Sequence, residues 1–239
     1  MTPRHDRFLF ISDTQEPFAH HRAIQFCKDV QREYGIPNEN CFHVGDEVDQ
    51  YFGSMYTKDP DAWHSPLSEI RDTIEKMKEW YAAFPMMKVC RSNHGDRWIK
   101  KATAAEIPSM MLKAYQELIE APENWVWRKQ WLIQCKYPIK VMHGVGYGGM
   151  YAYRTAALDS NINVVFGHLH SNAGVAHIRT HDKYCWGLNV GCLIDEQAYA
   201  FRYNKEQRNR PILGCGVAVD DGLRPIFVPL DDYQMEDVG

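Results

Sequence analysis

Short apolar runs and longer amphipathic segments alternate through the first half of the chain, a pattern typical of alternating strands and helices. Three apolar runs have the length of a strand: 7–12, 41–44 and 86–90. Three longer segments carry apolar residues close to the helical period: 20–34, 67–84 and 102–119. We expect Ser68 to cap the second of these helices, and Pro108 to break the third or to start its second part.

Strand-like runs dominate the second half, which is rich in aromatic and β-branched residues. The expected strands are 125–135, 139–142, 162–166, 173–178, 183–190, 212–219 and 223–228. A glycine-rich loop at 144–149 precedes a helix expected at about 150–158. Two mixed β-sheets packed face to face, with helices outside, accommodate this order. We therefore predict an α/β (α+β) fold, a four-layer αββα sandwich, as a single domain over 1–239 with a loop insertion at 51–66.

The composition suits one globular domain, because 45% of the 239 residues are hydrophobic and 24% are charged. The formal net charge of -4 does not indicate non-specific nucleic-acid binding. Seven cysteines without C-x-x-C spacing predict reduced thiols. No apolar segment approaches the length needed to span a bilayer. We expect a soluble cytoplasmic protein that does not associate with a membrane.

Five of the apolar runs are followed immediately by side chains that can bind a metal ion. The turns that carry them are Asp13–Gln15, Gly45–Asp49, Asn93–His94, His143–Gly144 and Gly167–His170. Strand ends of this kind are where open α/β sheets bind their ligands. Imidazole, carboxylate and amide donors suit borderline-to-hard divalent metals, and the lack of cysteine in these turns argues against a structural zinc site. The chain is therefore expected to gather the five turns around a pair of metal ions.

In this order the five turns resemble the motifs of the calcineurin-like metallophosphoesterase superfamily. That family's pattern is D-x-H, G-D-x-x-D, G-N-H-[DE], a single H and G-H-x-H. The corresponding residues here are Asp13-x-Gln15, Gly45-Asp46-x-x-Asp49, Ser92-Asn93-His94-Gly95-Asp96, His143 and Gly167-His168-x-His170. The turn at 189–192 also resembles one, N-P-G-S, that often follows the last motif. The resemblance spans most of the chain, and five motifs in order are far more specific than any one of them.

The resemblance implies two divalent metal ions that share the carboxylate of Asp46. One ion would be held by Asp13, Gln15, Asp46 and His170. The other would be held by Asp46, Asn93, His143 and His168. Manganese is the expected metal, with iron, zinc, nickel or magnesium as alternatives. A hydroxide that bridges the two ions would attack phosphorus, because metals lower the pKa of bound water.

The resemblance further implies that His94 and Asp49 are catalytic. His94 would bind a phosphoryl oxygen or protonate the leaving oxygen, and Asp49 would accept a hydrogen bond from it. Gln15 stands where the family usually has histidine, and its amide oxygen favours harder ions. Ser92 replaces a usual glycine. Gln50 stands where the Ser/Thr protein phosphatases have a phosphate-binding arginine, which argues against a phosphoprotein substrate.

Further residues near the third and fourth motifs could contact the substrate. They are Arg91, Arg97, Lys100, Tyr147 and Arg154. The basic residues could instead form a solvated surface, and the tyrosine could pack in its loop rather than stack on a base. Gln15 and Asp49 have alternative roles too, as a solvated loop amide and as a helix N-cap.

These features predict an enzyme, a metal-dependent phosphoric ester hydrolase that cleaves phosphodiester bonds. A DNA or RNA nuclease and a phosphomonoesterase acting on nucleotides or phosphoproteins are the alternatives within the same superfamily. A binding scaffold without activity is the alternative of a different class, since some relatives lose metal ligands. The expected partner is a phosphoester substrate, with nucleic acid among the alternatives.

Overall fold

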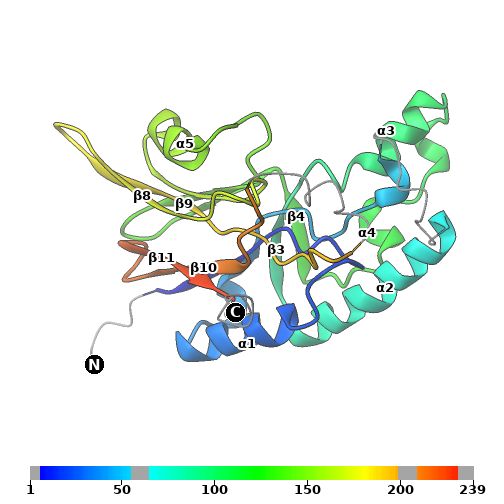
Figure 1. The fold of residues 1–239 in the computed structure, drawn as a ribbon, viewed down its shortest axis with the longest axis horizontal. Coiled ribbons are helices and arrows are strands. Elements are labelled where there is room, and N and C mark those ends of the chain that lie inside the picture. The colour runs from blue at the N-terminus through cyan, green and yellow to red at the C-terminus, as the bar shows by residue number, and fades with distance from the viewer. Residues whose placement is uncertain (1–5, 55–64, 199–208, 231–239) are drawn as a thin grey trace, which may run out of the picture.

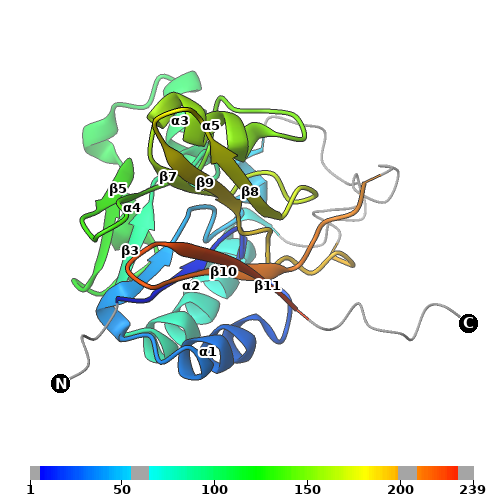
Figure 2. The ribbon, with the colours of Figure 1, turned by 90° about the vertical axis from the view of Figure 1, so that its left-hand side faces the viewer.

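The computed structural model describes residues 6–54, 65–198 and 209–230, which form two β-sheets with helices around them (Figures 1 and 2). The first sheet has six strands in the order β11-β10-β1-β2-β3-β4. These strands are β1 (Phe8–Ile11), β2 (Cys41–His43), β3 (Met87–Cys90), β4 (Trp125–Arg128), β10 (Gly214–Val219) and β11 (Arg224–Pro229). Neighbouring strands from β1 to β4 are parallel, whereas β10 is antiparallel to both β1 and β11.

The second sheet has five strands in the order β5-β6-β7-β9-β8. They are β5 (Gln130–Ile133), β6 (Ile139–Met142), β7 (Asn163–Phe166), β8 (Gly174–Arg179) and β9 (Tyr184–Asn189). The central strands β6, β7 and β9 are parallel, and β5 and β8 are antiparallel to their neighbours. Both sheets are therefore mixed, as predicted.

Helices cover the outer face of each sheet or lie in the connections between strands. They are α1 (Ala23–Glu33), α2 (Pro66–Ala83), α3 (Arg97–Ala104), α4 (Tyr115–Leu118) and α5 (Ala152–Ser160). Short 3-10 turns are η1 (Asn38–Asn40), η2 (Tyr51–Gly53) and η3 (Ser109–Met111). Figures 1 and 2 show α1 and α2 along the first sheet and α5 over the second. No helix among the described residues is long and apolar enough to cross a membrane.

Three apolar clusters fill the spaces between these layers. Phe10 and Phe42 of the first sheet meet Val141 and Trp186 of the second in the space between the sheets. A second cluster joins α1 and α2 to the outer face of the first sheet, and a third joins α5 to the second sheet. Because both faces of the central strands are covered, a strand such as β1 is buried at every position. The predicted α/β sandwich is confirmed.

The prediction of one strand over 125–135 is wrong. β4 pairs with β3 in the first sheet, whereas β5 pairs with β6 in the second, and the chain changes sheet at Lys129. Trp125 and Trp127 are buried on one face of β4. Since aromatic and β-branched residues occur in both β4 and β5, the residue pattern shows no break at the point where the chain crosses.

The expected helix over 102–119 is also wrong in its extent. α3 begins earlier, at Arg97, and ends at Ala104. Glu106 then takes a left-handed conformation with φ of 57°, which interrupts the helical path. Pro108 precedes η3, so the break falls where proline predicted it.

The N-cap of α2 is Ser65 and not Ser68. The Ser65 hydroxyl accepts a hydrogen bond from the backbone N–H of Ser68 at 3.1 Å, and Pro66 occupies the first helical turn. The expected loop at 51–66 therefore ends one residue earlier, because Pro66 already belongs to α2. Its first residues form η2, and 55–64 lie outside the described residues.

Candidate metal centre

Loops at the carboxyl ends of strands from both sheets meet at one place. β1, β2 and β3 lead into the loops of Asp13, Asp46 and Asn93, and β6 and β7 lead into those of His143 and His168. Within each sheet these strands are parallel, so their carboxyl ends lie at a common edge. The fold thus unites the loops that the sequence predicted.

Two of these loops are bound to each other by their backbones. The N–H of Asp13 donates to the Gly45 carbonyl at 3.0 Å, and that of Gln15 donates to the Asp46 carbonyl at 2.9 Å. Asp13, Gln15 and Asp46 all have positive φ, at 49°, 49° and 53°. Non-glycine residues adopt this region at a cost, and such strain gathers at functional sites. The backbone bonds hold the strained turns in place.

Two glycines allow the loops to come this close. A Cβ on Gly45, which has φ of 114°, would lie 2.8 Å from Nδ1 of His143 and 2.8 Å from Cβ of Ser92. A Cβ on Gly167 would lie 2.2 Å from the hydroxyl of Ser12. A side chain at either position would therefore push the loops of the two sheets apart.

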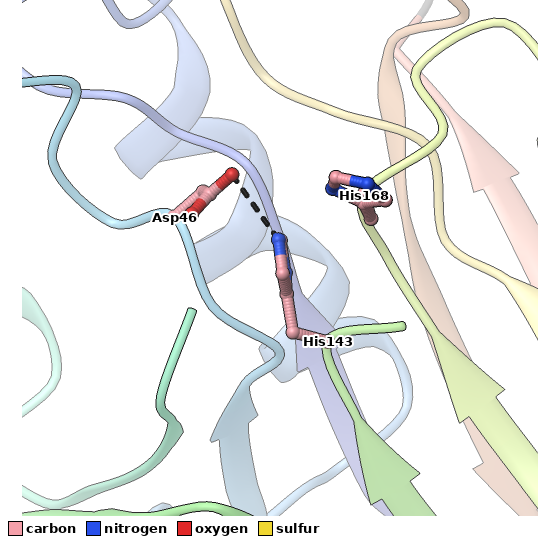
Figure 3. Close-up of side chains that lie close together, drawn as sticks. All are labelled: Asp46, His143 and His168. Atoms are coloured by element: carbon pink, nitrogen blue, oxygen red, sulfur yellow. Dashed lines mark ion pairs between the residues drawn. The ribbon is translucent and has the colours of Figure 1, made fainter. Parts of the chain in front are cut away.

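The first group of donors consists of Asp46, Asn93, His143 and His168. Nε2 of His143 lies 3.1 Å from Oδ2 of Asp46 and 3.0 Å from Oδ1 of Asn93. A ligand atom from each of Asp46, His143 and His168 can be chosen so that all three lie within 4.8 Å of one another. Figure 3 shows these three side chains directed toward a common space. They could hold a metal ion.

The hydrogen bonding of His143 tests whether a cation fits this group. Nδ1 lies 3.1 Å from the carbonyl oxygen of Val44, an acceptor, so this nitrogen carries a proton. Nε2 then faces two more acceptors, on Asp46 and Asn93, and needs either a second proton or a metal ion between them. Burial disfavours the charged ring, but the Asp46 carboxylate outweighs it and raises the pKa of His143 to about 9. The position therefore attracts positive charge, and a metal ion fits it.

The second group consists of Asp13, Gln15 and His170. Nε2 of His170 lies 3.1 Å from Oδ1 of Asp13 and 3.3 Å from Nε2 of Gln15. The amide oxygen of Gln15 is buried and has no hydrogen-bond partner among the described residues. A buried oxygen without a donor is costly, and a metal ion would satisfy it. The donor set of this group therefore fits a cation as well.

The two groups adjoin each other through His168 and Asp46. The backbone N–H of His168 donates to Oδ2 of Asp13 at 3.0 Å, while its ring belongs to the first group. Asp46 is 2% exposed, and its Oδ1 accepts from the backbone N–H of His94 at 3.1 Å. Burial works against the charged form of Asp46, yet the nearby His143 and His94 rings hold its pKa well below the usual value. Asp46 thus brings an ionised, buried carboxylate to the first group, while its backbone oxygen accepts from Gln15 of the second group at 2.9 Å.

His94 and Asp49 lie beside these groups and contact each other. Nδ1 of His94 lies 2.8 Å from Oδ1 of Asp49, an ion-pair distance without the alignment of a full hydrogen bond. Nε2 of His94 lies 3.7 Å from Oδ2 of Asp46 and 2.6 Å from Nη2 of Arg97. The hydrogen bond that the resemblance implied between His94 and Asp49 is therefore replaced by a close contact of the two side chains, and their catalytic roles remain predictions.

Two buried glutamates next to the candidate ligands form contacts that the sequence did not predict. Nε1 of Trp80 donates to Glu16 at 2.7 Å, and the Tyr115 hydroxyl and Trp127 Nε1 both donate to Oε1 of Glu47, at 2.6 and 2.8 Å. Burial raises the pKa of Glu16 to about 7 and also raises that of Glu47. The signal in the sequence was a carboxylate beside each motif, but its partners come from α2, α4 and β4. These contacts anchor the ligand loops to the scaffold.

Only some of the predicted substrate contacts lie at the centre. Arg97 contacts His94, as described. Arg91, Lys100 and Arg154 are exposed, and within the described ranges their side chains form no hydrogen bond or ion pair with the candidate ligands. Tyr147 packs edge-on against Phe166, with ring centroids 6.1 Å apart. Tyr147 thus packs against the end of β7, and its contact with a substrate remains a prediction.

Fold and site together define an α/β sandwich with a candidate metal centre at the joined strand ends. No protein-family model matches the sequence, and no curated protein does. Among solved structures the chain is similar to Vps29 from Chaetomium thermophilum, with a TM-score of 0.38 and 10% identity over 89% of this chain and 83% of that one. It is also similar to hypothetical protein PH1004 from Pyrococcus horikoshii OT3, with a TM-score of 0.48 and 11% identity over 94% and 87% of the two chains. Both TM-scores are too low for either likeness to carry an argument.

Proposed function

We propose that this protein is a metal-dependent phosphoester hydrolase that binds two divalent ions and cleaves phosphodiester bonds. The observation that carries the proposal is the environment of His143. Its Nδ1 is committed to the Val44 carbonyl, and its Nε2 meets acceptor atoms of Asp46 and Asn93 at 3.1 and 3.0 Å. Electron-pair donors gathered in this way are an arrangement for binding a cation.

The proposed ligands divide into two sets that share Asp46. One set is the first group described above, Asp46, Asn93, His143 and His168. The other set is the second group, Asp13, Gln15 and His170, together with Asp46. Manganese is the metal we propose, because oxygen donors make up half or more of each set. Bound divalent ions polarise phosphoryl oxygens and make water a nucleophile near neutral pH.

His94 and its neighbours are the residues we propose for binding or protonating the oxygens of the ester. Nε2 of His94 faces the metal ligands, so we assign it to a phosphoryl oxygen or to the leaving oxygen of the ester. Asp49, 3% exposed in its side chain, holds the other edge of the ring. Positioned acids and oxyanion contacts of this kind typically contribute on the order of 10²–10⁴-fold in rate.

The surroundings of Gln50 support a diester rather than a monoester. Its side-chain oxygen accepts from the backbone N–H of Trp98 at 2.9 Å, and its nitrogen donates to the Gly95 carbonyl at 3.3 Å. Both ends of the amide are thus used to hold the loop before α3. A monoester dianion gains from an additional fixed cation, and Gln50 supplies none.

Hydrolysis of a substrate panel by the metal-loaded protein tests the proposal. We expect cleavage of a bis-aryl phosphate to exceed that of an aryl phosphate at equal manganese, and chelation to abolish both. Asp46→Asn should lose bound metal and most activity, whereas Asp182→Asn, an exposed control in the turn between β8 and β9, should lose neither. Bound metal is counted by elemental analysis.

Other outcomes of the same panel distinguish the alternatives. Preference for the monoester would replace the diesterase with a phosphomonoesterase, and cleavage of single-stranded or duplex DNA or of RNA would indicate a nuclease. Full activity in metal-free protein or in Asp46→Asn contradicts the metal-dependent mechanism. Stoichiometric metal without hydrolysis of any substrate would leave a binding scaffold.

A further inference from the structure

The guanidinium of Arg97 occupies a fixed position at the edge of the metal centre. Arg97 begins α3, and its Nη1 donates to the backbone oxygen of Asp49 at 2.8 Å and to Oδ1 of the same residue at 3.0 Å. Its Nη2 lies 2.6 Å from Nε2 of His94. The Arg97 side chain is 19% exposed and that of Asp49 is 3% exposed. The arginine therefore lies between the buried site and solvent, and each of its two terminal nitrogens has a partner.

The contact between Arg97 and His94 places two groups where one ligand atom could meet both. Because Nη2 and Nε2 are 2.6 Å apart, an oxygen that binds one of them lies within reach of the other. Nε2 also faces Oδ2 of Asp46, so this point borders the proposed metal ligands. Arg97 can exchange its contact with His94 for such an oxygen and keep both contacts with Asp49.

The charge of Arg97 is compensated by Asp49. The carboxylate lies against both the guanidinium and the ring of His94, and the neighbouring Gln50 is neutral. The Arg97–Asp49 pair therefore offers directed N–H donors with little net positive charge. A phosphate diester carries one negative charge, whereas a monoester carries about 1.5 to 2 at neutral pH. Such a pair suits the diester, since the second charge of a monoester would meet no uncompensated cation here.

We infer that Arg97 binds a non-bridging oxygen of the substrate phosphate and that its pairing with Asp49 selects monoanionic diesters over dianionic monoesters. This inference rests on the proposed phosphoesterase function and names its source of substrate selectivity. Arginine matches phosphate geometrically through its planar fork of donors. Arg97 lies at the start of α3, whereas the phosphate-binding arginine of the Ser/Thr protein phosphatases would correspond to Gln50, directly after Asp49.

Two phosphonates that differ by one charge test the inference by binding alone. Phenylphosphonate is a dianion at pH above neutrality, and its monomethyl ester is a monoanion of nearly the same shape. Calorimetric titration of manganese-loaded protein gives the affinity of each probe in the wild type, Asp49→Asn, Arg97→Gln and the control Arg179→Gln. Arg179 is an exposed arginine at the end of β8. Metal content and circular dichroism verify that each variant is loaded and folded.

We expect Asp49→Asn to raise the affinity for the dianion relative to the monoanion by roughly tenfold, because Arg97 then carries an uncompensated charge. Loss of His94 positioning alone would change both affinities together and leave their ratio unaltered. Arg97→Gln should weaken the binding of both probes, and Arg179→Gln the binding of neither. An unchanged ratio in Asp49→Asn, or wild-type binding of both probes by Arg97→Gln, overturns the inference.

Arg97→Gln keeps the test decisive if Asp49→Asn does not fold. The Arg97 side chain is partly exposed, so its replacement is tolerated more easily, and the affinities of Arg97→Gln for the two probes can by themselves contradict the proposed contact. The proposed function can fail separately. A wild-type protein that binds the probes and metal but hydrolyses no phosphoester would reject the enzyme, while the effects of the two variants on probe binding would still decide the role of Arg97.

Discussion

Gln15 brings an amide into a site where a histidine nitrogen is the more usual donor of the resembling family. Its side chain lies against His170, and its buried oxygen has no partner among the described residues. An amide can present either its oxygen or its nitrogen by turning over, and only the oxygen binds a metal. Gln15 therefore affects which ion the second group of ligands prefers.

We expect Gln15→His to shift the preference of the protein from manganese toward zinc, because imidazole is the better partner for zinc. Equilibrium competition between the two metals, followed by elemental analysis, measures the shift. Gln130→His adds a histidine at an exposed position of β5 and serves as the control. The same preference in both variants and in the wild type would show that Gln15 is not a ligand.

His43 is a buried histidine behind the ligand loops. It is 1% exposed, its Nδ1 accepts the N–H of Gly45 at 3.3 Å, and its Nε2 lies 3.2 Å from the Thr14 hydroxyl. Burial lowers the pKa of His43 from 6.5 to about 4. Between these two pH values the unfolded chain binds a proton here that the folded chain does not, so the free energy of unfolding decreases as the pH falls.

Replacement of this histidine should remove that part of the pH dependence. We expect metal-free wild type to lose more stability between pH 7 and pH 5 than His43→Asn does, in urea unfolding measured at both pH values. The comparison of the two proteins cancels groups that titrate in both, such as Glu16. Equal losses in the wild type and the variant would mean that His43 is not held neutral in the fold.

At the scale of elements, the scaffold reaches the metal loops through helices and strands remote in sequence. α2 supplies Trp80 to Glu16, α4 supplies Tyr115 to Glu47, and β4 supplies Trp127 to the same glutamate. Each donor fixes a carboxylate adjacent to a candidate ligand. The stability of α2 therefore bears on the position of the Gln15 loop.

The start of α2 offers a direct test of the observed cap. Ser65→Ala should cost about 1 kcal/mol in the free energy of unfolding, because it removes the side-chain acceptor of the Ser68 N–H. Ser68→Ala, at the position expected from the sequence, should cost less, since the Ser68 hydroxyl contacts only exposed groups of Ser65, its carbonyl at 3.0 Å and its hydroxyl at 3.2 Å, and accepts from no backbone N–H of the first turn among the described residues. Urea unfolding compares the two variants. A larger loss for Ser68→Ala would contradict the assignment of the cap.

At the scale of the whole molecule, the candidate centre joins the two sheets. Asp13, Asp46 and Asn93 follow strands of the first sheet, and His143 and His168 follow strands of the second. Ions bound by both sets would therefore stabilise the folded sandwich relative to the unfolded chain, in which these residues are far apart.

We expect manganese to raise the melting temperature and a chelator to reverse the change. A free manganese concentration roughly one hundred times the dissociation constant of one site increases the free energy of unfolding by about 2.7 kcal/mol. His168→Ala should reduce the increase, while Asp182→Asn should keep it. Thermal unfolding with and without manganese measures this. A melting temperature that does not respond to any divalent ion would argue against a metal centre between the sheets.

Much of the fold could be predicted because its signals are local. The strands β1, β3, β6 and β7 lie within the expected ranges, since an apolar run of strand length followed by a turn is visible within a few residues. The crossing from β4 to β5 could not be predicted in this way. The same kinds of residue form both strands, and which sheet each one joins depends on pairing with β3 and β6.

The sequence by itself determined which residues could bind metal and that each follows a strand, because both properties are written within single short segments. Only the tertiary structure decided which of them meet: Asp46 with His143, Asp13 with His170, and Arg97 with Asp49. The same holds for the indole donors that anchor Glu16 and Glu47. Residue patterns report local conformation, whereas these contacts depend on how two sheets pack, and packing joins segments whose separation along the chain carries no information about their distance in space.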